Sequence, residues 1–354
     1  MRAVTVLPGF AGSVRVDDLA EPGTDEGSVL VETLAVGVCG TDLEIAAGDY
    51  GEAPPGQDRL VLGHESVGRV LEAPEGANLV SGDLVVAMVR RPDPVPCASC
   101  AVGEWDMCRN GRFTEHGIKA LHGFAREWFR VDPDRLVKVD PSLGWLGVLI
   151  EPASVVAKAW EHIERIAARV HYAPRRVLVT GAGPIGLLAA LLGAQRGLDV
   201  HVVDLVTEGP KPGLVRDLGG TYHSDPVESL NLEADIVVEC TGVPSVVVAA
   251  MTSTGRNGIT CLTGVSGAGR SIPLDVGGLN RELVLENDVV FGSVNANRWH
   301  YEQAAAALAG ADREWLSRLV SRRVGLDDVG QALCSHPLDV KVLLDFGIAE
   351  ESRE

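Results

Sequence analysis

The feature that most constrains the fold is a charge-free stretch in which a short apolar run meets a glycine-rich turn. Residues 177–179 (Val-Leu-Val) lead into residues 181–186 (Gly-Ala-Gly-Pro-Ile-Gly), and residues 187–196 have the composition of a helix. In such a strand, turn and helix, the first glycine permits the tight turn, the second lets backbone N–H groups approach a pyrophosphate, and the third lets the helix pack on the strand. The helix N-terminus then faces the anion. The stretch predicts dinucleotide binding by Gly181, Gly183, Pro184, Ile185 and Gly186.

A second apolar run, residues 200–203, ends in Asp204. An acidic residue at this point accepts hydrogen bonds from both ribose hydroxyls of NAD and repels the 2′-phosphate of NADP. Residues 205–207 (Leu-Val-Thr) bring no arginine that would grip this phosphate, although Lys211 or Arg216 can fold back towards it. The sequence therefore predicts NAD as the preferred cofactor and NADP as the less favoured one.

Length and composition exclude several other classes of protein. A chain of 354 residues has the length of two domains, and its net charge of −18 argues against a nucleic-acid partner. Residues 177–195 are long enough to span a bilayer, but the glycines gather at their start and no comparable second segment exists. The N-terminus reaches Pro8 before the hydrophobic core of a signal peptide can form. Seven cysteines, an odd number, make a disulfide framework unlikely, so we expect a cytoplasmic protein with thiols available for metal.

The first part of the chain, to about residue 150, consists of short β-rich runs broken by Gly, Pro and Asp, as at residues 28–36 and 83–87. This pattern is typical of a partly open β-barrel with long functional loops. Two loops place Cys39 and His64, side chains that zinc prefers as ligands, beside glycines. Glu151 is a carboxylate in an apolar run, which invites a cation or an ion pair. Taken singly, each of the three also fits an ordinary structural role.

From about residue 158 to residue 298, β-rich runs alternate with helical ones, which predicts a doubly wound parallel sheet. The loops at the carboxyl ends of such strands line the cofactor crevice. We therefore expect five residues beside the nicotinamide half of the dinucleotide: Thr241, Gly264, Val265, Ser293 and Asn295. Cys240 and Cys261 lie in apolar runs and are expected in the core.

Several motifs resemble the zinc-dependent medium-chain alcohol dehydrogenase superfamily. They are Gly63-His64-Glu65 followed by Gly68, Cys39-Gly40-Thr41-Asp42 upstream, and the glycine turn downstream. Residues 115–118, 122–124, 149–152 and 292–295 are similar to the glucose 1-dehydrogenase branch. The resemblance implies an α/β fold with a GroES-like β-barrel catalytic domain (1–157), a Rossmann domain with a doubly wound parallel sheet (158–298), and a return to the catalytic domain (299–354). It also implies a homo-dimer or homo-tetramer.

The resemblance further implies site residues. Cys39, His64 and Glu151 would be ligands of a catalytic zinc ion, with Glu65 as an exchangeable ligand or a base beside it. Thr41 resembles the hydroxyl of a proton relay, although an ordinary turn hydroxyl is the alternative.

A cysteine-rich stretch is similar to the structural-zinc lobe of the superfamily, with one ligand missing. Cys97, Cys100 and Cys108 match the last three ligands, but Pro94 stands where the first cysteine would be. Asp93 is a candidate for the missing ligand, and the alternative is a loop that holds no metal.

The resemblance implies an NAD(P)-dependent dehydrogenase that takes hydride from a sugar, and three residues suggest a polar substrate pocket: Glu115, Glu151 and Asn295. The pocket suits an aldose such as glucose, but Val89 and Val155 are apolar where sugar-binding members of the branch present polar side chains. A polyol, cyclitol or amino-alcohol dehydrogenase on the same scaffold is the first alternative. A dinucleotide-binding protein without catalysis is the second.

Overall fold

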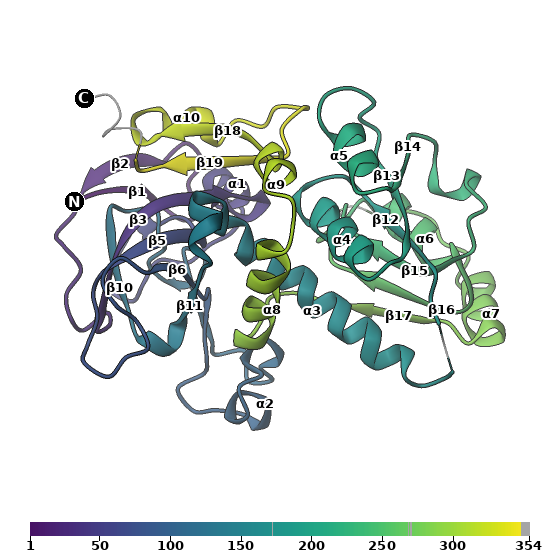
Figure 1. Ribbon diagram of the computed structural model, residues 1–354, viewed down its shortest axis with the longest axis horizontal. Coiled ribbons are helices and arrows are strands. Elements are labelled where there is room, and N and C mark those ends of the chain that lie inside the picture. The colour runs from purple at the N-terminus through teal and green to yellow at the C-terminus, as the bar shows by residue number, and fades with distance from the viewer. Residues whose placement is uncertain (172, 268, 270, 348–354) are drawn as a thin grey trace. The chain divides into compact units, whose positions relative to one another are not determined.

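The computed structural model describes residues 1–171, 173–267, 269 and 271–347 (Figure 1). It forms two compact units, one of Met1–Ser154 with Ala296–Glu354 and one of Val155–Asn295. The sequence placed the corresponding boundaries after residues 157 and 298.

The main sheet of the first unit has the strand order β11-β6-β5-β3-β19-β18, and β10 also pairs with β3. In β3, buried residues alternate with partly buried ones over much of the strand, because one face of the sheet lines the core of the unit. The strands of this sheet are β3 (Val29–Val38), β5 (Glu65–Glu72), β6 (Leu84–Ala87), β10 (Trp128–Val131), β11 (Leu136–Lys138), β18 (Val320–Gly325) and β19 (Lys341–Asp345).

Smaller elements complete this unit. One small sheet has the order β2-β1-β4, and another has the order β7-β8-β9. Their strands are β1 (Arg2–Val6), β2 (Arg15–Asp18), β4 (Leu60–Val61), β7 (Arg90–Arg91), β8 (Thr114–His116) and β9 (Ala120–Leu121). The α-helices are α1 (Gly40–Ala47), α2 (Ala98–Ala101), α8 (Arg298–Ala309), α9 (Arg313–Leu319) and α10 (Val329–Ala332), and α3 (Ile150–Ala167) runs on into the second unit. The 3₁₀-helices are η1 (Trp105–Met107), η2 (Pro133–Arg135), η3 (Pro141–Leu149) and η5 (Leu326–Asp328).

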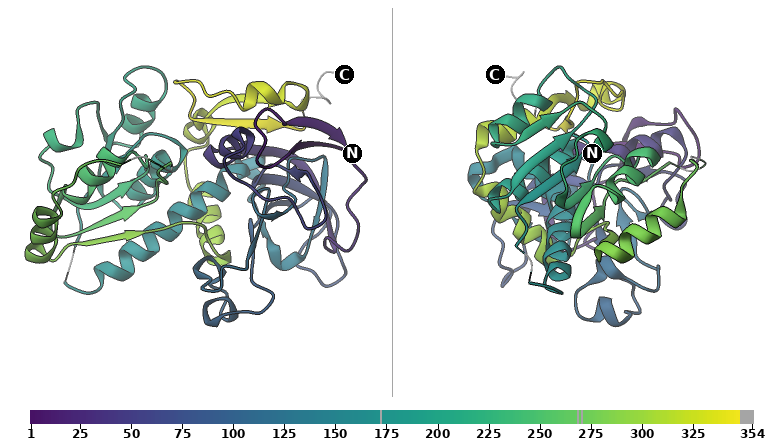
Figure 2. Two further views of the ribbon diagram at one scale, coloured as in Figure 1. Left: turned by 180° about the vertical axis from the view of Figure 1, so that it is seen from behind. Right: turned by 90° about the vertical axis from the view of Figure 1, so that its right-hand side faces the viewer.

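The end of the chain returns to the first unit. Strand β19 pairs with β3 in antiparallel register, with Val342 opposite Val38. Figure 2 shows this yellow strand beside the purple strands from the start of the chain. Lys341, the first residue of β19, is thereby brought to the end of β3, beside the start of α1.

The second unit is a parallel sheet with the strand order β14-β13-β12-β15-β16-β17. This is the order of a doubly wound dinucleotide-binding fold, with the switch in direction between β12 and β15. The strands are β12 (Arg176–Thr180), β13 (Asp199–Val203), β14 (Thr221–His223), β15 (Ala234–Glu239), β16 (Thr254–Leu262) and β17 (Val289–Gly292). The connecting helices are α4 (Pro184–Gln195), α5 (Lys211–Asp217), η4 (Val227–Ser229), α6 (Pro244–Met251) and α7 (Val276–Glu286). The α/β fold class predicted from the sequence is confirmed.

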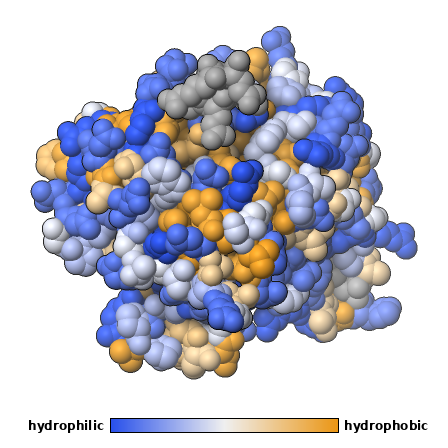
Figure 3. Space-filling view, turned by 60° about the vertical axis from the view of Figure 1, so that its left-hand side comes forward, coloured by the Kyte–Doolittle hydropathy of each residue, from blue (hydrophilic) through white to orange (hydrophobic). Residues whose placement is uncertain are grey.

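Apolar length alone gives a misleading membrane signal in this chain. Residues 177–195 are divided between β12, the glycine turn and α4, as the dinucleotide interpretation requires. The continuous helical segment Pro141–Ala167 is long and apolar enough to cross a membrane, but 78% of its apolar window is buried inside the structure. Such burial is typical of a core helix. Hydrophilic residues surround smaller hydrophobic patches on the face drawn in Figure 3.

Two glycines of the turn are expected to meet different requirements: close packing at Gly186 and access for the pyrophosphate at Gly183. One substitution at each position tests this. A Cβ at Gly186 would collide with the carbonyl oxygen of Gly181, whereas a Cβ at Gly183 would meet no described atom within 4 Å. We expect Gly186→Ala to destabilise the protein by about 1–3 kcal/mol, as overpacking does. We expect Gly183→Ala to leave the thermal midpoint unchanged and to weaken dinucleotide binding by roughly tenfold, because its methyl group meets the pyrophosphate. Calorimetry and fluorescence titration with NADH and NADPH measure the two effects. Equal loss of stability in both variants would contradict this assignment.

Candidate active site

The first side chain of the site caps a helix. Cys39 is the N-cap of α1, and its Sγ accepts a hydrogen bond from the backbone N–H of Thr41 at 3.3 Å. Asp42 completes the cap, because its carboxylate accepts a hydrogen bond from the backbone N–H of Cys39 at 3.0 Å. This reciprocal bonding fixes the sulfur at the end of β3.

His64 lies between the Cys39 sulfur and the Asp42 carboxylate. Its Nε2 is 3.0 Å from Cys39 Sγ, and its Nδ1 is 3.5 Å from Asp42 Oδ1. Burial alone would lower the pKa of His64, but the neighbouring Cys39 and Asp42 raise this pKa well above its ordinary value. Burial likewise opposes ionisation of Asp42, yet the interaction with His64 holds the pKa of Asp42 below its ordinary value. The imidazole is therefore oriented by a carboxylate behind it.

Glu65 and Lys341 form a buried ion pair next to this imidazole. Gly37, opposite Glu65 in the pairing of β3 with β5, has no side chain, and a Cβ there would collide with the Glu65 carboxylate. Lys341 Nζ also donates a hydrogen bond to the carbonyl of Val38 at 3.1 Å. Burial alone would lower the pKa of Lys341, but Glu65 and its other anionic neighbours raise this pKa.

Glu151 lies in the first turn of α3, near the same group of charges. Burial, followed by the charge of Glu65, raises the pKa of the Glu151 carboxyl to about 7. Tyr301 is buried close by, and burial together with the charge of Glu151 raises the pKa of its phenol well above the ordinary value. The Tyr301 hydroxyl accepts a hydrogen bond from the backbone N–H of Val89 at 3.3 Å.

The donor set around His64 fits a zinc ion. Cys39, His64 and Glu65 offer a sulfur, an imidazole nitrogen and a carboxylate oxygen that lie within 4.8 Å of one another. These are the ligand types that zinc prefers, and the Asp42 carboxylate behind His64 is the usual orienting partner of a zinc-bound imidazole. Among the described residues, Glu151 is not in this set of neighbouring ligand atoms. Besides burial, the charges of Glu65 and His64 act on its carboxyl group.

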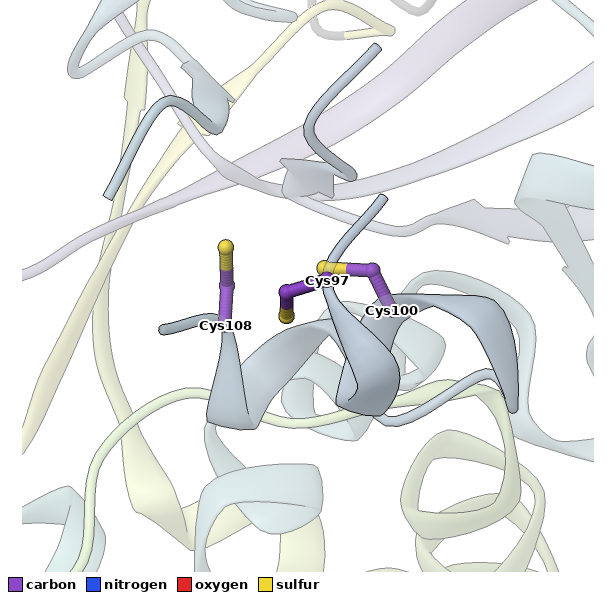
Figure 4. Close-up of side chains that lie close together, drawn as sticks. All are labelled: Cys97, Cys100 and Cys108. Carbon is purple, nitrogen blue, oxygen red and sulfur yellow. The ribbon is translucent and has the colours of Figure 1, made fainter. Parts of the chain in front are cut away.

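The cysteine-rich stretch brings its three thiols together (Figure 4). Cys97 is the N-cap of α2, Cys100 lies within this helix, and Cys108 ends η1. The three sulfurs lie within 4.8 Å of one another. Figure 4 shows them on the same side of the two short helices.

Asp93 does not join these sulfurs. Its Oδ1 accepts a hydrogen bond from the N–H of Val95 at 2.8 Å, and its Oδ2 accepts bonds from the side chains of Asn110 at 2.8 Å and Arg112 at 3.3 Å. These bonds hold the pKa of Asp93 below its ordinary value. Structural zinc sites have four protein ligands, and the part of the chain that the structure describes supplies three here, so the residues do not complete such a site.

The predicted cofactor loops of the second unit converge. Gly181, with a φ of 90°, approaches Thr241 so closely that a Cβ on it would lie 2.9 Å from the Thr241 methyl group. Gly264 and Val265 pack on the Thr241–Gly242 backbone, and Ser293 bonds through its N–H to the carbonyl of Leu262 at 2.9 Å. Asn295 has a φ of 62° at the end of this unit. All five predicted residues of the nicotinamide half thus follow the carboxyl ends of β15, β16 and β17.

Sequence reasoning missed the carboxylate that holds these loops together. Glu239 is fully buried at the end of β15. Its Oε1 accepts hydrogen bonds from the backbone N–H groups of Thr241 at 2.7 Å and Gly242 at 3.1 Å, and from the Thr180 hydroxyl at 3.4 Å. A glutamate at the end of an apolar strand, two residues before Thr241, was the available signal.

Asp204 is already engaged within the chain. Its Oδ2 accepts a hydrogen bond from Ala182 N–H at 2.7 Å, and its Oδ1 accepts one from Val206 N–H at 2.9 Å. Lys211 Nζ lies 3.2 Å from Oδ2, and both side chains are largely buried. Lys211 therefore folds back onto Asp204, and the negative charge expected at the ribose has a cationic partner.

The expected substrate residue Glu115 is buried and paired. Its carboxylate lies 2.9 Å from Arg90 Nη2, across the pairing of β7 with β8. Thr41, the expected relay, lies in the first turn of α1, two positions after Cys39. Lys341, Asp42 and Tyr301 are site neighbours to which the sequence analysis assigned no role. A lysine beginning an apolar strand was the only local signal for Lys341.

Comparisons with known proteins agree with this architecture. Residues 25–141 match the alcohol dehydrogenase GroES-like domain, and residues 144–346 match the glucose dehydrogenase C-terminus. The chain is 40% identical to glucose 1-dehydrogenase of Methanocella arvoryzae, over 98% of this chain and 100% of that protein. It is 41% identical to glucose 1-dehydrogenase of Thermoproteus tenax, over 97% and 99% of the two chains.

A solved structure of Haloferax mediterranei glucose dehydrogenase, in complex with NADP, Zn and gluconolactone, is also similar. The TM-score is 0.90 at 32% identity, and the match covers 98% of this chain and 99% of that one. The family predicted from the sequence motifs is confirmed. The chain belongs to the glucose dehydrogenase branch of the zinc-dependent medium-chain alcohol dehydrogenases.

Proposed function

We propose that the protein is a zinc-dependent dehydrogenase that transfers hydride from a hydroxyl of an aldose such as glucose to NAD or NADP. The observation that carries the proposal is the group of Cys39, His64 and Glu65, of which His64 and Glu65 are buried, with Asp42 behind the imidazole. The relatives support the substrate class, since they are glucose 1-dehydrogenases.

Cys39, His64 and either Glu65 or Glu151 would hold the ion. Zinc held by these residues would supply a Lewis acid for the oxygen of the substrate hydroxyl. Lys341 forms an ion pair with Glu65. This ion pair keeps the Glu65 carboxylate in place when Glu65 is not a ligand of the ion. Thr41 passes the hydroxyl proton towards solvent, and Glu115, Glu151 and Asn295 bind the other hydroxyls of the sugar. The protein thereby orients the reacting carbon towards the nicotinamide ring.

Val89 favours a second candidate substrate class. The side chain of Val89 is buried and apolar, and its backbone N–H donates a hydrogen bond to the Tyr301 hydroxyl. Residue 89 therefore offers no polar side-chain group to a substrate. A polyol, cyclitol or amino alcohol with no hydroxyl that requires a partner at residue 89 would suit such a pocket. A non-catalytic dinucleotide-binding protein is disfavoured because the zinc-type donor set is complete enough to hold an ion. A cytoplasmic homo-dimer or homo-tetramer remains a prediction.

For the cofactor, we propose that both dinucleotides are used, with NAD ahead of NADP. Asp204 favours NAD, because a carboxylate at the ribose accepts hydroxyl hydrogen bonds. The Lys211 ammonium offsets its charge and lowers the repulsion of a 2′-phosphate, which supports use of NADP as well. The Haloferax mediterranei glucose dehydrogenase structure holds NADP.

The function is tested by following NAD and NADP reduction with glucose, galactose, xylose, sorbitol, inositol and threonine. We expect an aldose to be oxidised, activity to be lost after treatment with a chelator, and zinc to restore it, because the ion is needed to polarise the substrate. Oxidation of only a polyol or an amino alcohol would move the substrate to the second class. Full activity in a protein shown to be free of metal would contradict the proposal.

The cofactor proposal predicts the effect of removing the Lys211 charge. In Lys211→Met, Asp204 loses its cationic partner, so we expect the ratio of kcat/KM for NADP to kcat/KM for NAD to fall by about tenfold. Arg216→Met is the matched control, since Arg216 is an exposed cation on the same helix, α5. An unchanged ratio in Lys211→Met would show that the pair does not face the 2′-position.

A further inference from the structure

Arg90 forms a buried ion pair with Glu115, and the proposed catalytic scheme assigns Arg90 no role. The two residues lie directly opposite each other where β7 pairs with β8, and their side chains are 8% and 9% exposed. Arg90 Nε lies 3.0 Å and Nη2 lies 2.9 Å from Glu115, and both contacts are to Oε1. Two N–H groups on one oxygen restrict the direction in which the carboxylate points.

A third bond from the same guanidinium reaches the cysteine-rich stretch. Arg90 Nη1 donates a hydrogen bond to the backbone carbonyl of Asp106 at 3.2 Å. Asp106 lies in η1, the short helix that ends at Cys108. The Arg90 guanidinium therefore bonds both the Glu115 carboxylate and the backbone between Cys100 and Cys108.

The surroundings of the pair hold it rigidly. The Arg90 guanidinium carbon lies 3.7 Å from the centre of the Phe113 ring. The backbone N–H of Glu115 bonds the carbonyl of Lys119 at 2.9 Å, which closes the turn after β8. A planar guanidinium can stack on a ring and bond in three directions at once, and a lysine ammonium cannot reproduce this fork.

The charge of the Glu115 carboxylate also acts on a tyrosine that is partly exposed. Tyr50 is 50% exposed, and burial of its phenol, followed by the charge of Glu115, raises its pKa. A carboxylate that Arg90 holds in one direction suits recognition of sugar hydroxyls.

We propose that Arg90 is the positioning residue for sugar recognition, fixing the Glu115 carboxylate and linking it to the three-cysteine stretch. The proposal rests on the proposed function, in which Glu115 binds sugar hydroxyls. It assigns to the cysteine stretch an influence on substrate affinity through the Asp106 carbonyl. If the cysteine stretch becomes mobile, the Arg90 guanidinium loses its hydrogen bond to the Asp106 carbonyl and can move. The Glu115 carboxylate is then no longer held in one orientation.

The first test compares Arg90→Met and Arg90→Lys with the wild-type protein. We expect both variants to raise the KM for the sugar by about tenfold or more, because a small misplacement of a binding group is costly. The KM for the dinucleotide and the zinc content should stay at wild-type values. Arg90→Lys keeps the charge and guards against a folding failure of Arg90→Met. Arg130→Met is the control, since it removes another arginine–glutamate pair, with Glu72, in the same unit.

A change confined to the KM for the sugar supports the positioning role. An unchanged sugar KM in both Arg90 variants would overturn it. A parallel rise in both KM values with loss of zinc would also overturn it, because a residue needed only for stability would act in this way.

The link to the cysteine stretch is tested by a double-variant cycle. Cys108→Ser should raise the sugar KM in the wild-type background and cause no further rise in Arg90→Met, since the connection is already broken. Equal increases in both backgrounds would overturn the link. If the wild-type protein oxidises a polyol but no aldose, the assigned aldose substrate fails, and the same variants measured with that polyol test Arg90 separately. A protein that oxidises neither class overturns both proposals.

Discussion

The structure of the first unit depends on how it accommodates buried charge. Asp42, His64, Glu65 and Lys341 are all buried, and they come from a helix start, a loop, a strand start and the last strand of the chain. An unpaired ion in such a place costs several kcal/mol. Each of these side chains therefore requires its neighbours. The pairing of β19 with β3, which brings Lys341 to Glu65, is as much a requirement of the site as of the sheet.

The second unit uses a buried carboxylate in another way. Glu239 is held by backbone N–H groups and hydroxyls, among them those of Thr180 and Thr241. Hydrogen bonds to the charged form can stabilise a buried carboxylate. Because Thr180 precedes the glycine turn and Thr241 lies in the loop after β15, Glu239 links two segments that are predicted to contact the dinucleotide.

Local sequence patterns predicted the elements well. The strand, glycine turn and helix at residues 177–196, and the apolar run before Asp204, appear as β12, α4 and β13 because their signals are contained within a few residues. The family was also predictable, since its motifs are short. The partners of the charged residues could not be predicted in this way. Lys341 donates a hydrogen bond to the Val38 carbonyl, 303 positions away in the chain, and no local pattern shows such a contact.

Two expectations about individual side chains illustrate the same limit. Asp93 was a candidate fourth ligand by position, yet Asn110 and Arg112 occupy its oxygens from later in the chain. Asp204 was expected at the ribose, with Lys211 or Arg216 able to fold back towards it, and in the structure it is Lys211 that reaches it from α5. In both cases the residue type and its place were correctly read, and a contact from a neighbouring element changed what the side chain can do.

The most direct test of the account is the zinc content of the purified protein and of His64→Ala, measured by inductively coupled plasma mass spectrometry. The group of Cys39, His64 and Glu65 is the proposed site of the catalytic ion. The account predicts that His64→Ala binds one equivalent of zinc fewer than the wild-type protein while keeping its affinity for the dinucleotide. Equal zinc content in the two proteins would contradict it.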